Sequence, residues 1–167
     1  MTQATVSPKD YIAFLGDFPE LIGRFMCAFS SCEFWTYVIL ECLGSRQVRA
    51  ELSGAALKVR LGRIEQLLRE RAVPDDIRKD FVELHKQIRK LAKKRNLAAH
   101  NTPMAYVYEH ERTGDLEIRW EMRHANNPAL EVTREHLNAW FEEATKLEYE
   151  CTMLHARLNK AAAEQRA

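Results

Sequence analysis

Three polar side chains near residue 100 have the types and the spacing for acid–base and anion-binding chemistry. Arg95 is followed directly by Asn96, and His100 comes five residues after the arginine. An imidazole changes its charge near neutral pH, so a histidine can accept or donate a proton. A guanidinium binds anionic oxygens, including those of phosphate, with paired hydrogen bonds. Asn96 and His100 are four residues apart, so they share one face if the segment is helical.

Arg95 also interrupts an apolar pattern. A helix is predicted to begin at Pro74-Asp75-Asp76 and to run toward His100, with one narrow apolar face whose spacing is four, three, four and three residues. The apolar positions are Ile77, Phe81, Leu84, Ile88 and Leu91. The next position of this face is Arg95, and a guanidinium is costly to bury unless it is paired. Such breaks concentrate at functional sites, although an arginine at a helix end can also extend its charge to water.

Arg95 and His100 do not share a helical face. At about 100° per residue, five residues separate the two side chains by roughly 140°. The two groups can therefore meet only if the helix unwinds before Pro103, or across an interface between two chains. His100 by itself has a plainer interpretation, because histidine near a helix C-terminus often satisfies a free carbonyl.

A run of basic residues leads up to Arg95. Its members are Lys86, Arg89, Lys90, Lys93 and Lys94, and no acidic residue interrupts them. A solvated helix face is the usual meaning of such a run, and a phosphate-binding strip is the sharper one. Because the run ends at Arg95, these side chains are candidate phosphate contacts. The remaining histidines show no partner pattern and are interpreted as surface or structural: His85, His110, His124, His136 and His155.

Length and composition limit the possible functions. A chain of 167 residues fits a single domain, residues 1–167, and its 46% hydrophobic and 29% charged residues are typical of a globular protein. Lys and Arg total 25 against 24 Asp and Glu. A protein that coats nucleic acid without specificity has a stronger basic excess, so any nucleic-acid contact should be local.

The cysteines and the apolar segments indicate a soluble, cytoplasmic protein. The four cysteines form no C-x-x-C pair and no zinc-type cluster, so we expect reduced thiols, mostly in the core, and no metal or other cofactor: Cys27, Cys32, Cys42 and Cys151. The polar N-terminus predicts no signal peptide. The longest apolar stretch, 34–43, contains Glu41 and is too short to span a bilayer, so no membrane contact is expected.

The elements that must position these residues form a mainly α-helical pattern. Capping residues and apolar periodicity predict a bundle of four to five helices, at 8–15, 17–43, 55–71, 74–100 and from 133 to beyond 158, with a fraying tail at 160–167. Glu33 lies on an apolar face of the second of these helices. Alternating residues around Thr113-Gly114-Asp115 predict one β-hairpin, at about 104–123, and Asn126-Asn127-Pro128 predict a loop.

Arg95, Asn96 and His100, at the end of a long helix, resemble the signature of the HEPN family. The family pattern is an arginine, four to six residues and a histidine, with a polar residue, often Asn, directly after the arginine. The three residues match it in order, spacing and type. The family is a small helical bundle whose two long helices pack together, and the long helix bearing Glu33 resembles its early core helix. The resemblance covers about residues 17–103 and the last helix.

The resemblance implies a metal-independent endoribonuclease of the toxin or antiviral-defence kind, usually a homodimer whose two motifs face each other. In this chemistry a ribose 2′-hydroxyl loses a proton and attacks the adjacent phosphate, and the leaving oxygen gains a proton. His100 would then serve as acid or base, Arg95 would bind the phosphate, and Asn96 would orient His100 or the substrate. Glu33 would support them, and the basic run would contact RNA. An antitoxin or another regulatory protein is a possible partner.

Two departures from the family keep other functions open. Thr102 stands where one branch carries a tyrosine used by a nucleotidyltransferase partner, and the hairpin is not part of the minimal family core. Some family members have lost catalysis, so the alternative is an inactive helical dimer that binds RNA or protein. A third option is a helical regulator that binds a small nucleotide near Arg95.

Overall fold

The computed structural model describes residues 16–71, 73–124 and 127–164. The helices in these ranges are α2 (Phe18–Leu43), α3 (Arg46–Glu51), α4 (Leu57–Glu70), α5 (Asp75–His100) and α6 (Arg134–Glu164). A small antiparallel sheet, ordered β1-β2-β3, is formed by β1 (Pro103–Glu109), β2 (Leu116–His124) and β3 (Asn127–Val132). The predicted mainly α fold with a β-hairpin is therefore confirmed.

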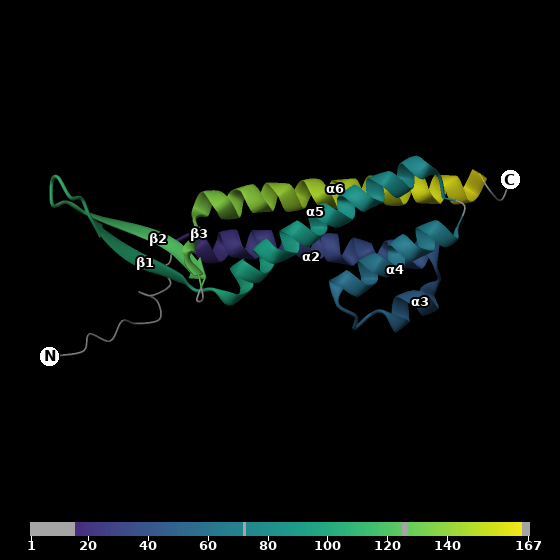
Figure 1. Ribbon diagram of the computed structural model, residues 1–167, viewed down its shortest axis with the longest axis horizontal. Helices are drawn as coiled ribbons and strands as arrows, with labels where there is room; N and C mark the ends of the chain where they lie inside the picture. Colours follow the sequence, from purple (N-terminus) through teal and green to yellow (C-terminus); the bar gives the residue numbers. More distant parts are fainter. Residues whose placement is uncertain (1–15, 72, 125–126, 165–167) are drawn as a thin grey trace.

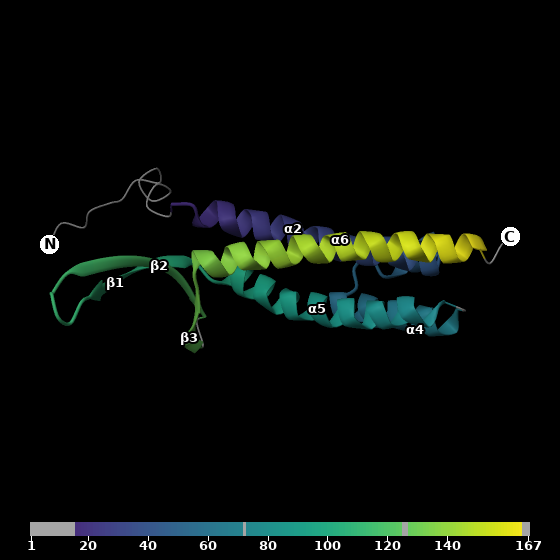
Figure 2. The same cartoon turned by 90° about the horizontal axis from the view of Figure 1, so that it is seen from above.

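The three long helices lie lengthwise beside one another. α2 and α6 run in the same direction, α5 runs back across them, and α3 and α4 lie beside the second half of α2 (Figures 1 and 2). The hairpin of β1 and β2 projects beyond the end of the bundle where α5 stops and α6 starts (Figure 1). This arrangement places the C-terminal end of α5 next to the first half of α2.

α2 is the central helix of the bundle. It starts at Phe18 with Pro19 in its first turn, and the N–H of Gly44 closes it by donating to the Leu40 carbonyl at 2.8 Å. Its inward face is fully buried at Phe25 and at neighbouring apolar residues that contact α4, α5 and α6. By length and composition, α2 is the one helix in the described ranges that could cross a membrane. That property is weak evidence, because the core helix of a soluble protein shares it.

The apolar face predicted for α5 is confirmed. Ile77, Phe81, Leu84, Ile88 and Leu91 are each at most 4% exposed and belong to the shared core. Asp75 and Asp76 lie in the first turn, where acidic side chains favour the helix dipole. The helix continues without interruption to His100, so Arg95 and His100 are fixed on different sides of it.

The hairpin forms where it was predicted, with one more residue at each end. Its turn closes through the His110 N–H, which donates to the Asp115 carbonyl at 2.8 Å. Gly114 takes a φ of +71°, a conformation that favours glycine. Val107 pairs with Ile118 in the antiparallel register of β1 and β2.

The elements differ from the prediction in three places. The loop predicted at 126–128 is a third strand from Asn127, because Val132, 3% exposed, pairs with the buried Met122 and closes the end of the core. α3 was not predicted; the Ser45 side chain caps it by accepting from the Val48 N–H at 3.3 Å. α6 continues to Glu164 instead of fraying from Lys160, with Leu158 buried and Ala161 packed against the core. The helix predicted at 8–15 lies outside the described residues.

Candidate functional site

Arg95 lies in the penultimate turn of α5 and faces the middle of α2. Its Nη2 is 3.8 Å from Oε2 of Glu33, and its guanidinium carbon lies 5.3 Å from the centroid of the Phe29 ring. The side chain is 29% exposed. Glu33, which the sequence suggested as a supporting residue, pairs with Arg95 across an ion pair longer than a hydrogen bond.

The Arg95 guanidinium keeps hydrogen-bonding capacity that the protein does not use. Its Nε is buried and has no hydrogen-bond partner among the described residues. A buried donor without an acceptor costs about 1–3 kcal/mol, so packing alone gives no reason for an arginine at this position. An anion that approaches the exposed part of the guanidinium would find it incompletely paired.

Arg60 is a second arginine at the site, and it was not predicted from the sequence. It lies in the first half of α4 and is only 5% exposed. It donates from Nε to Thr36 Oγ1 at 3.1 Å, and from Nη1 to the Tyr37 hydroxyl at 2.7 Å and the Ala55 carbonyl at 2.6 Å. The sequence contains a pattern that could have identified Arg60. It comes three residues after Leu57, on the apolar face of its helix, so like Arg95 it is a charged side chain at an apolar position.

Glu33 connects the two arginines. Its Oε1 accepts from Arg60 Nη2 at 3.1 Å, and its Oε2 faces Arg95. The Glu33 side chain is 26% exposed, so one oxygen is held inside the bundle while the other reaches the surface cation. One carboxylate and two guanidinium groups leave this cluster with a net charge of +1, which favours an anionic ligand.

His100 is exposed at the last residue of α5, and Asn96 is exposed one turn earlier. No hydrogen bond or ion pair within the described ranges joins His100 to Arg95, Asn96 or Glu33. The free carbonyl of Leu97 is satisfied by the Asn101 side chain, which donates from Nδ2 at 2.7 Å. His100 therefore does not cap the helix end, and one chain does not bring its imidazole together with Arg95.

Four members of the basic run line a shared open groove between α4 and α5. Lys86, Arg89, Lys90 and Lys93 border it, together with Glu65, Val82 and His85, and its volume is about 360 Å³. His85 Nδ1 hydrogen-bonds to Glu65, which ties the two helices together beneath the cations. Lys86 also pairs with Glu83 at 3.3 Å. The groove offers several cations to one extended anion.

Lys94 belongs to a different face of α5. Its amine pairs with Glu143 of α6 and lies 5.8 Å from the centroid of the Trp140 ring. In the sequence Lys94 looks like the other basic residues, because no acidic residue interrupts the run. The tertiary structure instead supplies a carboxylate from a helix that begins about 40 residues later in the chain.

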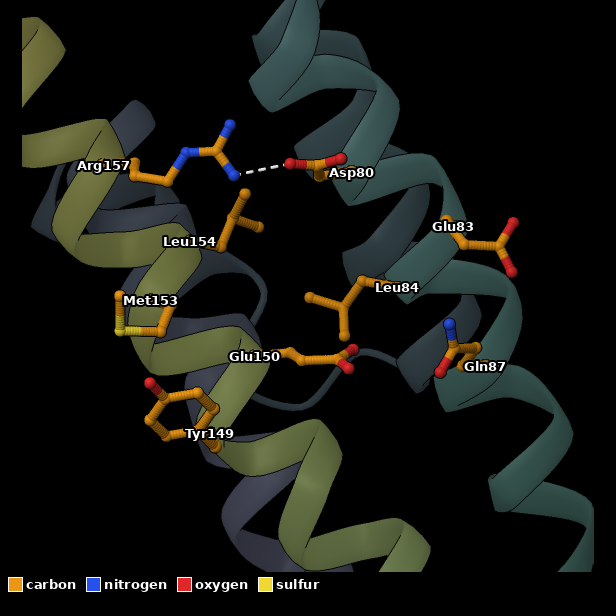
Figure 3. A pocket seen from close by; sticks show the side chains of 9 residues that line it. All are labelled: Asp80, Glu83, Leu84, Gln87, Tyr149, Glu150, Met153, Leu154 and Arg157. Atoms are coloured by element: carbon orange, nitrogen blue, oxygen red, sulfur yellow. Dashed lines mark hydrogen bonds and ion pairs between the residues drawn. The ribbon is translucent and has the colours of Figure 1, made fainter.

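The opposite side of α5 is acidic. A groove between α5 and α6 is lined by the acidic Asp80, Glu83 and Glu150 and by the apolar Leu84 and Leu154 (Figure 3). The one cation at its edge, Arg157, already pairs with Asp80 at 2.5 Å and Asp76 at 2.7 Å. This face repels phosphate, so the charge distribution directs an anion to the α4 side of α5.

Two of the thiols are buried in the core. Cys32 and Cys151 are buried between α2 and α6, and burial raises the pKa of the Cys32 thiol to about 12. Cys27 is exposed. In the part of the chain that the structure describes, no three His, Cys, Asp or Glu side chains are grouped so that they could hold a metal ion.

Arg95 and His100 therefore represent two halves of a possible site. Arg95 offers a partly exposed guanidinium that can bind phosphate, and His100 offers an imidazole that is open to solvent. No family model, no curated protein and no solved structure matches this chain.

Proposed function

We propose that the protein is a metal-independent endoribonuclease of the HEPN type that acts in toxin or antiviral-defence systems in the cytoplasm. The main support for the proposal is the Arg95 side chain. Its guanidinium is part-buried at an apolar position of the helix, and its Nε has no acceptor among the described residues. Arg60 provides the contrast, because its donors are directed to protein acceptors. Arg95 is the arginine that retains capacity for a phosphate.

In the proposed reaction, the ribose 2′-hydroxyl loses its proton to the imidazole of His100 and its oxygen bonds to the adjacent phosphorus. The bond from phosphorus to the 5′ oxygen of the next nucleotide breaks, and that oxygen receives a proton from an imidazolium. Arg95 balances the negative charge that gathers on the five-coordinate phosphate. Asn96 orients the imidazole or the substrate. The products are a 2′,3′-cyclic phosphate and a 5′-hydroxyl.

The site requires two copies of the chain. Arg95 and His100 lie on different sides of an unbroken helix, so we propose that the arginine of one copy works with the histidine of another in a homodimer. The outer face of α2, which adjoins the Arg95–Glu33 pair, supports this arrangement. Between Arg24 and Glu41 this helix carries a single charged residue, Glu33, and Phe34 is 53% exposed. A sparsely charged, partly aromatic face of this kind is typical of an interface.

The basic groove supplies the path for the substrate. Lys93 and His100 are seven residues apart, so at about 100° per residue they lie on the same side of α5, about 10 Å apart along its axis. A strand of RNA lying in this groove would reach His100 with several phosphates already neutralised. The projecting hairpin lies at the same end of the bundle as His100 (Figure 1), where it can contact the bound strand.

The test is cleavage of labelled RNA by the purified protein in EDTA. His100→Ala and Arg95→Ala should each abolish cleavage while circular dichroism shows unchanged helicity. His155→Ala is the matched control, because His155 lies in the second half of α6, away from the end of the bundle that carries His100, and this variant should cleave normally. A cyclic phosphate at the new end would support attack by the 2′-hydroxyl.

Mixing the two inactive variants tests whether the site is shared. A mixed dimer of the Arg95→Ala and His100→Ala chains contains one intact arginine–histidine pair, so random mixing should restore about a quarter of the wild-type activity. No recovery would contradict the shared site. A folded dimer that binds varied RNAs without cutting them would favour the alternative, a catalytically inactive RNA- or protein-binding module.

A further inference from the structure

We infer that Arg60 is a positioning residue for Arg95 and that it acts through Glu33. The inference rests on the proposed function, because it assigns Arg95 to the phosphate. Arg60 itself is buried and touches no substrate. Arg60 fixes the position of the Glu33 carboxylate, and this carboxylate in turn orients the Arg95 guanidinium.

Arg60 has one possible position for its guanidinium. Acceptors on three sides hold it: Thr36 Oγ1, the Tyr37 hydroxyl and the Ala55 carbonyl, at 3.1, 2.7 and 2.6 Å. The Tyr37 ring also lies beneath it, with the centroid 4.3 Å from the guanidinium carbon. A planar fork held in this way cannot rotate, so its remaining nitrogen, Nη2, points in a fixed direction.

That direction determines the position of Glu33. Nη2 of Arg60 donates to Glu33 Oε1 at 3.1 Å. The hydroxyl of Thr36, which accepts from Arg60, in turn donates to the Glu33 carbonyl at 2.7 Å. The same arginine therefore fixes both the side chain and the local backbone of Glu33, and leaves Oε2 as the free oxygen of the carboxylate.

Arg95 depends on that oxygen. In the described part of the chain, Glu33 is the one acidic side chain that pairs with Arg95. Its other neighbour is the Phe29 ring, which offers a surface but no directional acceptor. A long side chain held by a single ion pair at 3.8 Å loses its orientation when the partner moves, because the rotamers it gives up in the pair become accessible again.

The experiment measures whether Arg60 and Arg95 are coupled. The probe is a fluorescein-labelled RNA with 2′-O-methyl groups, which carries the phosphates but cannot be cleaved. Arg60→Lys keeps the charge and removes the fork, so it should weaken binding of the probe at least about threefold, within the range seen for residues of one network. In an Arg95→Ala background the same substitution should have no effect. Arg63→Lys, on the same helix and paired with Glu70, is the matched control and should change nothing.

Two further measurements test whether Arg60 positions Arg95. If Arg60→Lys does not fold, Tyr37→Phe removes one acceptor of Arg60 and should weaken binding in the same direction, again only when Arg95 is present. The Nε resonance of Arg95 in ¹⁵N spectra should shift in Arg60→Lys and stay unchanged in Arg63→Lys. Equal effects with and without Arg95, or no effect in a folded variant, would overturn the inference.

Failure of the proposed function would look different. If wild type does not bind the probe, or if Arg95→Ala binds it equally well, Arg95 does not bind phosphate and the ribonuclease proposal fails. The Arg95 resonance then decides the positioning role by itself: a shift on Arg60→Lys supports it, and an unchanged resonance overturns it. If the probe binds with the expected coupling but RNA is never cut, the positioning role stands and catalysis does not.

Discussion

Nη2 of Arg95 lies 3.8 Å from Oε2 of Glu33, and this ion pair joins the end of α5 to the middle of α2. It forms at a position that the apolar spacing of α5 would give to a leucine or methionine. Glu33 also has Arg60 as a closer partner, at 3.1 Å, so its charge stays balanced without Arg95. The protein therefore keeps a cation that its own charge balance does not require.

Replacing Arg95 with methionine should remove function without loss of stability. Arg95→Met completes the apolar face and removes a buried Nε without an acceptor, so the free energy of unfolding should stay the same or rise by about 1–2 kcal/mol. RNA binding and cleavage should be lost. Urea unfolding followed by circular dichroism measures the first effect, and the probe RNA the second.

Arg60→Met is the contrasting variant and should lose about 2–4 kcal/mol, because it leaves Glu33 and the polar acceptors of Arg60 unpaired. A large loss of stability in Arg95→Met would mean that the arginine is structural.

The salt dependence of RNA binding should identify the basic groove as the phosphate path. Each of Lys86, Arg89, Lys90 and Lys93 that contacts a phosphate should contribute about 0.7 to the slope of log K against log salt concentration for a single strand. Substituting any one of them with glutamine should reduce the slope by that amount. Lys94→Gln makes the same change of charge on the same helix, but Lys94 is paired with Glu143, so its slope should stay unchanged. Equal effects at Lys94 and at the groove positions would contradict a defined path.

The cysteines should react in an order set by burial. Burial raises the pKa of Cys32 to about 12, with the nearby Glu148 adding to the shift, and burial also raises the pKa of Cys151. At pH 8 the folded protein should therefore react at Cys27, which is exposed, while Cys32 and Cys151 stay protonated and protected. Labelling with a disulfide reagent and mapping by mass spectrometry checks this order, and Cys27→Ser should remove the fast phase.

The same shift fixes a pH dependence of stability. A thiol whose pKa is higher in the folded state than in the unfolded state stabilises the fold fully below the unfolded pKa, and this stabilisation is lost as the pH rises toward the folded value. For Cys32 the loss should occur between about pH 9 and pH 12, and Cys32→Ala should flatten the curve in that range. In the labelling experiment described above, fast reaction of Cys32 at pH 8 would show that α2 and α6 do not pack as described.

The amino-acid sequence by itself determined most of the elements. Caps, glycine stops and apolar spacing predicted the limits of α2 and α5 closely, and alternation around Gly114 predicted the hairpin. These signals are local: they depend on backbone sterics and on contacts between residues three or four apart. The same local reasoning selected Arg95, because its position on an apolar face is visible in the spacing alone. Short elements without such a pattern, α3 and β3, were missed.

The tertiary structure alone decided which charges meet. Arg60 and Arg95 are 27 and 62 residues from Glu33, and no local period relates such separations. Lys94 looks like its basic neighbours in the sequence, yet packing turns it toward α6 and gives it a carboxylate. The tertiary structure also decided that α5 remains helical up to His100, and this separates the His100 side chain from Arg95. Helix formation follows from neighbouring residues, whereas the partners of a charge follow from how the helices pack, because Coulomb interactions act through space and not along the chain.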